Sequence, residues 1–183
     1  MERSRRQFLF GGFRKIGEVK DAITQSKIKR SEHIIRPPGA IPESEFIEKC
    51  EKDCFRCLAA CPTYVIQKVA DLTSPAYRTA YIDSHISGCS FCQDFPCVAA
   101  CTYGALASDI KPLGVAKVLA SCITKQGEFC EICMSSCPEH HQSIAKNRNG
   151  VLQIDSERCV GCGKCVSACF LVPKAIAVYS ADE

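Results

Sequence analysis

Four cysteines near the end of the chain have a spacing that is typical of a metal-cluster site. They occur as Cys159-x2-Cys162-x2-Cys165-x3-Cys169. In this arrangement three neighbouring thiolates bind one iron–sulfur cluster, and the fourth reaches a second cluster. Gly161 and Gly163 lie inside the motif, where backbone at positive φ can turn N–H groups toward sulfur. The motif therefore predicts a set of cluster ligands.

The other twelve of the sixteen cysteines form three more groups of four. They are Cys50-x3-Cys54-x2-Cys57-x3-Cys61, Cys89-x2-Cys92-x4-Cys97-x3-Cys101 and Cys122-x7-Cys130-x2-Cys133-x3-Cys137. A cube of iron and sulfide needs several thiolates within one short loop, whereas a disulfide framework has no need of such clustering. The sequence therefore predicts four 4Fe-4S clusters in preference to a disulfide scaffold or structural zinc. Because the clusters require reduced cysteines, we expect a cytoplasmic protein.

The first motif also allows a catalytic interpretation. Its first three cysteines match the spacing of radical enzymes that cleave S-adenosylmethionine. Cys61 and Pro62, however, complete a ferredoxin set, and the chain is shorter than the barrel of such enzymes requires. The four histidines, His33, His85, His140 and His141, show no arrangement with a nucleophile or an acid pair. We therefore expect no catalytic residues and no substrate site.

Two predicted hairpins separate the motifs. Residues 64–69 and 77–82 are β-prone runs between motifs one and two, and residues 143–146 and 151–154 flank Asn149-Gly150 between motifs three and four. Residues 175–179 supply a closing strand, whereas residues 102–121 contain no candidate ligand and are expected to link two halves.

The order motif, hairpin, motif is that of a ferredoxin with two clusters. We therefore predict an α+β fold with two tandem bacterial-type 2[4Fe-4S] ferredoxin modules, residues 37–110 and 111–183, after a basic, partly helical arm at residues 1–36. Each motif of such a module lends its last cysteine to the other cluster. Sequential pairing gives the ligand sets Cys50, Cys54, Cys57 with Cys101; Cys89, Cys92, Cys97 with Cys61; Cys122, Cys130, Cys133 with Cys169; and Cys159, Cys162, Cys165 with Cys137. A nested pairing, motif one with four and two with three, stays open.

Charge is distributed unevenly along the chain. The formal net charge is +3, but residues 1–36 hold ten basic and four acidic residues, so the remainder is net acidic. Four cubes at about two negative charges each would bring the loaded protein to roughly −5. Apolar residues recur at helical spacing between Phe13 and Lys29, which predicts a basic amphipathic helix that docks on a partner, on an anionic membrane surface or on the protein's own body.

The arm begins with the twin-arginine pair Arg5-Arg6, which resembles an export signature. The uncharged apolar stretch that such a signal requires is missing, because Arg14, Lys15 and Glu18 follow closely. We therefore expect a cytoplasmic protein, in contact with the inner face of the membrane at most peripherally; export on a signal-bearing partner is the alternative. Nucleic-acid binding is not expected, since the acidic body opposes it.

Four segments in and around the cysteine motifs resemble a known family. They are Arg36-Pro37-Pro38-Gly39-Ala40, Cys92-Gln93-Asp94-Phe95-Pro96-Cys97, Gly114-Val115-Ala116 and Cys169-Phe170-Leu171-Val172-Pro173-Lys174-Ala175-Ile176. Over about residues 36–180 the chain resembles the NapG/MauM-type polyferredoxins. In lacking the apolar export region it is also similar to the cytoplasmic NapF-type ferredoxins.

The resemblance implies four 4Fe-4S clusters and an electron-transfer role within an oxidoreductase complex. The partners it implies are redox proteins, such as a quinol-oxidising membrane protein or a molybdenum-containing reductase. The NapF-like features imply an alternative to the electron-transfer role, namely a cytoplasmic maturation factor for such a reductase. The extra residue between Cys50 and Cys54 departs from the usual spacing and leaves the geometry of the first cluster open.

Overall fold

The computed structural model describes residues 34–138 and 142–180, which belong to one compact unit that starts at Ile34. The predicted helix from Phe13 to Lys29, the twin-arginine pair and three of the four histidines, His33, His140 and His141, lie outside the described residues. Every helix and strand within these ranges is short: the longest helix has seven residues and the longest strands have four.

The first sheet contains three antiparallel strands in the order β1-β3-β2. Strands β2 (Ile66–Lys68) and β3 (Ala80–Asp83) form the hairpin expected between motifs one and two, which confirms that prediction. Strand β1 (Ile34–Ile35), in a segment expected to belong to the arm, pairs with the other edge of β3. Ile66 and Ile82 face each other across the sheet and are both buried.

The second predicted hairpin is confirmed as β5 (Ile144–Lys146) and β6 (Leu152–Ile154). Its turn is closed by Asn147, whose Oδ1 accepts hydrogen bonds from the N–H groups of Asn149 (2.9 Å) and Val151 (3.0 Å). Gly150 has φ +77°, a conformation that favours glycine, so the Asn-Gly signal is satisfied.

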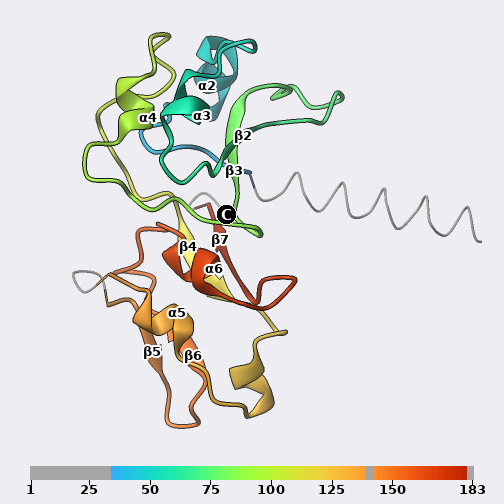
Figure 1. The fold of residues 1–183 in the computed structure, drawn as a ribbon, viewed down its shortest axis with the longest axis vertical. Helices are drawn as coiled ribbons and strands as arrows, with labels where there is room; N and C mark the ends of the chain where they lie inside the picture. The colour runs from blue at the N-terminus through green and yellow to red at the C-terminus, as the bar shows by residue number, and fades with distance from the viewer. Residues whose placement is uncertain (1–33, 139–141, 181–183) are drawn as a thin grey trace, which may run out of the picture. The chain divides into compact units, whose positions relative to one another are not determined.

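The third sheet has a strand that the sequence did not predict. The expected closing strand is β7 (Ile176–Tyr179), and it pairs antiparallel with β4 (Val115–Val118), which lies in the segment expected to be only a linker. Four residues are too few to show a clear alternating pattern, and β4 is stabilised by its pairing with a strand sixty residues away. In Figure 1, β4 and β7 lie side by side.

Four short helices have a common relation to the cysteine motifs. In α3 (Arg56–Ala60), α4 (Pro96–Ala99), α5 (Ile132–Ser135) and α6 (Lys164–Ala168), the second residue is the third cysteine of its motif. The helices pack in pairs, α3 with α4 and α5 with α6 (Figure 1). A 3-10 helix, η1 (Ile123–Gln126), occupies the long gap of the third motif. The same arrangement of helix and cysteine therefore occurs four times.

Helix α2 (Glu43–Lys49) stabilises the start of the body. Glu43 and Glu45 lie in its first turn and Lys49 in its last, which complements the helix dipole. Its one buried residue, Phe46, is 1% exposed, and the Arg36 guanidinium lies 4.5 Å from the centre of its ring. Arg36 also donates to the Glu43 carboxylate (2.8 Å) and to the backbone carbonyl of Ala80 (2.7 Å). Arg36 thus ties α2 to β3.

Replacing Phe46 with alanine should remove this packing. We expect Phe46→Ala to lower the free energy of unfolding by about 3–5 kcal/mol, because a buried aromatic ring is replaced by a cavity. Denaturant unfolding of protein purified without oxygen measures the loss. The matched control is Leu72→Ala, at a side chain that is 77% exposed, and equal midpoints for the two variants would contradict this account of the core.

Candidate iron–sulfur sites

All sixteen cysteines lie within the described residues, and each is a free thiol. The structure brings them together in four groups, numbered here by the motif that supplies three of the four members. Group I is Cys50, Cys54, Cys57 and Cys101; group II is Cys89, Cys92, Cys97 and Cys61; group III is Cys122, Cys130, Cys133 and Cys169; group IV is Cys159, Cys162, Cys165 and Cys137.

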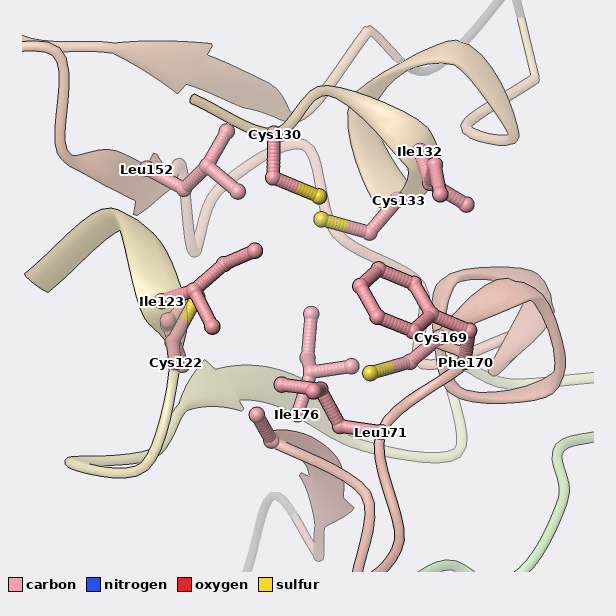
Figure 2. A pocket seen from close by; sticks show the side chains of 12 residues that line it. Cys122, Ile123, Cys130, Ile132, Cys133, Leu152, Cys169, Phe170, Leu171 and Ile176 are labelled. Carbon is pink, nitrogen blue, oxygen red and sulfur yellow. The ribbon is translucent and has the colours of Figure 1, made fainter. Parts of the chain in front are cut away.

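Group III lines an apolar pocket. Its four cysteines share the pocket wall with Leu152 and Ile176, which are buried, and with Ile123. Figure 2 shows the sulfur atoms of Cys130, Cys133 and Cys169 turned toward the space between these side chains. The fourth member, Cys122, enters from the other side, beside Ile123 (Figure 2). The sulfur atoms thus surround a space.

Groups II and IV line similar pockets. The pocket of group II also contains Pro38, Val65 and Ile66, and that of group IV contains Ala116 and Ile144. In each of these pockets three cysteines come from one motif and the fourth from the other motif of the same half of the chain. The assignment of these cysteines as the ligands of sequentially paired clusters stays a prediction.

The four members of group I are half-buried. The pKa of Cys57 is raised to about 11, by burial first and then by the neighbouring thiols of Cys50, Cys54 and Cys101, while Lys68 opposes the increase. The extra residue of the first motif lies in a turn in which the Cys54 N–H donates to the carbonyl of Glu51 (3.1 Å). The turn accommodates the extra residue, and Cys101 from the second motif still lies near the first three cysteines.

Burial also controls the protonation of the deeper thiols. Burial, together with neighbouring thiols of the same group, raises the pKa of Cys89 to about 12 and that of Cys133 to about 11. The pKa of Cys165 is raised as well, by burial first and then by Cys162, Cys159 and Cys133. Without a bound cation these thiols are protonated at neutral pH, so cluster or metal binding must release protons.

Backbone N–H groups donate to sulfur atoms of groups II and IV. The N–H of Phe91 donates to Cys89 Sγ, and the N–H of Ala116 on β4 donates to Cys159 Sγ, both at 3.4 Å. Gly161 and Gly163 have φ of +68° and +69°, which confirms the positive φ expected for both. The unpredicted strand β4 therefore contributes directly to group IV.

Hydroxyl groups lie against three more sulfur atoms. Thr63 Oγ1 is 3.5 Å from Cys61 Sγ, Thr124 Oγ1 is 3.3 Å from Cys122 Sγ, and Ser143 Oγ is 3.4 Å from Cys137 Sγ. Burial favours a higher pKa for Cys61, but the hydroxyl of Thr63 and backbone hydrogen bonds outweigh it, and the net pKa is lowered. These hydroxyls are placed to stabilise negative charge on sulfur.

These hydroxyl and N–H partners are not among the site residues expected from the sequence. Thr63 and Thr124 each follow a motif cysteine by two residues, a Cys-x-Thr pattern that is visible in the sequence. Ser143 and Ala116 have no such signal, because their partners are six and forty-three residues away.

The chemistry of the donor sets fits iron–sulfur clusters. Each group offers four sulfur donors, and three of the groups surround an apolar space. Within residues 34–138 and 142–180, no three His, Cys, Asp or Glu side chains meet closely enough to hold a single metal ion. Ligands of a four-iron cube are spread around its inorganic core and need not meet at one point.

The sequence is similar to those of known proteins. Residues 128–170 match the model of the 4Fe-4S dicluster domain. The methylamine utilization ferredoxin-type protein MauM of Methylophilus methylotrophus is 36% identical over 96% of this chain and 86% of its own length. The ferredoxin-type protein NapG of Escherichia coli is 32% identical over 97% and 86%, and NapF of the same organism is 27% identical over 85% and 92%. No solved structure matches the chain.

No helix among the residues that the structure describes is both long enough and apolar enough to span a bilayer.

The Thr124 hydroxyl offers a test of the sulfur contacts. Thr124 is 2% exposed, so Thr124→Val keeps its volume and removes the hydroxyl beside Cys122 Sγ. Since hydrogen bonds to sulfur set cluster potentials, we expect one iron–sulfur signal to shift to a lower midpoint potential in a redox titration monitored by electron paramagnetic resonance (EPR).

The control is Thr73→Val, because the Thr73 hydroxyl bonds to Asp71 (2.7 Å), in a turn away from the cysteines. Identical potentials in both variants and the unmodified protein would show that the Thr124 contact has no influence on a cluster.

Proposed function

Because the chain belongs to the family of ferredoxin-type proteins that includes MauM and NapG, we propose that it relays single electrons through four 4Fe-4S clusters. The observation that carries this proposal is the gathering of all sixteen cysteines into four groups of four. Bound 4Fe-4S clusters supply reversible one-electron chemistry. The proposed ligands are the members of groups I to IV, paired sequentially within two tandem modules.

The protein's own residues set the conditions for that chemistry. Apolar side chains such as Leu152, Ile176 and Ile144 keep water away from the sulfur atoms of groups III and IV. The hydroxyls and N–H groups beside sulfur compensate its negative charge and so raise the potential of the site that they serve. The four groups differ in these contacts, which supports a series of sites with different potentials.

The surface supports exchange with other proteins. Beside Cys130 an open hollow is lined by Phe129 and Phe170, which are 78% and 58% exposed, and by Ile132. Group I is half-exposed. An electron carrier needs sites close to its surface. Group III, which contains Cys130, and group I both meet that need. We propose redox proteins as donor and acceptor, with a quinol-oxidising membrane protein or a molybdenum-containing reductase as the classes to test.

Electron transfer and cluster delivery predict different results. Protein reduced with dithionite and freed of excess reductant should pass about four electrons per chain to a one-electron dye and keep its iron on gel filtration. A maturation factor would instead lose its clusters to an added cluster-free ferredoxin. Iron that moves to that acceptor, with few electrons delivered to the dye, would contradict the relay and favour the maturation role.

Paired substitutions test which cysteines share a cluster. Cys57 and Cys101 belong to one group although they come from different motifs, so the double variant Cys57→Ser/Cys101→Ser should lose about four irons, no more than either single variant. Cys57 and Cys61 belong to one motif but to different groups, so Cys57→Ser/Cys61→Ser should lose about eight.

Iron analysis of anaerobically purified protein measures both losses. A loss of eight irons from the first double variant would contradict sequential pairing and favour the nested arrangement.

A further inference from the structure

The two halves of the body meet at a pair of glycines. Gly88 directly precedes Cys89 of group II, and Gly163 directly follows Cys162 of group IV. Both glycines are buried, and a Cβ atom on Gly88 would overlap the Cα, carbonyl carbon and carbonyl oxygen of Gly163. A Cβ on Gly163 would lie 3.2 Å from the Gly88 carbonyl carbon and 3.3 Å from the Cys89 nitrogen. Only glycine allows the two backbones to approach this closely.

Two further contacts stabilise this meeting. The Gly88 N–H donates to Ser167 Oγ (3.1 Å), and Ser167 lies on α6, the helix that carries Cys165. The ring of His85 lies edge-on to that of Tyr179 on β7, with 6.3 Å between the ring centres. The segment before Cys89 is therefore attached to the second half of the body at both α6 and β7.

Within each half, the cysteine groups are joined through their helices. Helix α3 of group I packs on α4 of group II, and α5 of group III packs on α6 of group IV. The glycine contact joins group II to group IV. The groups thus form a series in the order I, II, IV, III, which differs from the order of the motifs along the chain.

We propose that electrons cross between the two halves at the Gly88–Gly163 contact, from group II to group IV or back, an inference that rests on the proposed four-cluster relay. One electron leaves the site of group II, which is oxidised, and arrives at the site of group IV, which is reduced. No bond is made or broken. Electron transfer weakens steeply with distance, and at this contact no side chain separates the loop of group II from the loop of group IV. Gly88 and Gly163 are positioning residues for this transfer.

Gly88→Ala tests the proposal in the full-length, cluster-loaded chain. Gly88 has no positive φ, so its own backbone accepts alanine, but the added Cβ meets Gly163 backbone atoms that cannot rotate away. The control is Gly104→Ala, where the Cβ meets nothing within 4 Å although φ is +69°. Both variants should keep the iron content of the unmodified protein. The iron content of the unmodified protein itself tests the proposed function separately.

The informative readout is the magnetic interaction between reduced clusters, measured by EPR. In a background with Cys57→Ser and Cys133→Ser, only groups II and IV should retain clusters, and their reduced signals should be split or broadened by each other. Gly88→Ala should weaken that interaction measurably, and Gly104→Ala should preserve it. An opposite background, Cys97→Ser with Cys162→Ser, keeps groups I and III and should show no interaction.

Two further comparisons apply if a variant loses iron. If the double-cysteine background loses its remaining iron, the same comparison is made in the four-cluster protein, where Gly88→Ala should reduce the broadening. If Gly88→Ala itself loses iron, Ser167→Ala replaces it, because it removes the hydroxyl that accepts the Gly88 N–H and adds no atoms. Full iron with interaction unchanged by these substitutions overturns the proposed crossing point, whereas low iron in the unmodified protein overturns the four-cluster relay.

Discussion

The burial of cysteine sulfur among apolar side chains is the constraint on which the rest of the structure depends. Elements of two to seven residues cannot by themselves enclose a large core, and six cysteines, Cys61, Cys89, Cys97, Cys122, Cys133 and Cys165, are part of the buried core. Thiols held this way are poor ligands until a cation displaces their protons, as the raised pKa values of Cys57, Cys89 and Cys133 indicate. Folding and cluster binding are therefore coupled.

This constraint explains the local architecture. Each short helix begins one residue before the third cysteine of its motif, so the helix fixes the direction of that sulfur. Apolar walls of the pockets of groups III and IV come from strands β5 and β6 and from the pair β4–β7. Strand β4 also supplies, at Ala116, an N–H donor to sulfur. Glycine is required where loops approach closely, most clearly at Gly163, whose φ of +69° and contact with Gly88 both exclude a side chain.

Local signals in the sequence were sufficient for much of the fold. The two hairpins between motifs could be predicted because the Asn149-Gly150 turn and the β-prone runs act over a few residues. Strand β4 could not be predicted, since it depends on pairing with β7, and neither could the Gly88–Gly163 contact, which joins segments seventy-five residues apart. Ile34 and Ile35 were assigned to the arm because a two-residue strand has no periodicity. What the sequence could not reveal are contacts between distant segments.

The most direct test of the central claim is the amount of iron and acid-labile sulfide bound per chain in protein purified without oxygen. The account predicts about sixteen of each, retained through gel filtration, because four groups of four cysteines would each hold a four-iron cluster. Eight or fewer of each would contradict the assignment of all sixteen cysteines as cluster ligands, and zinc in place of iron would contradict the electron relay itself.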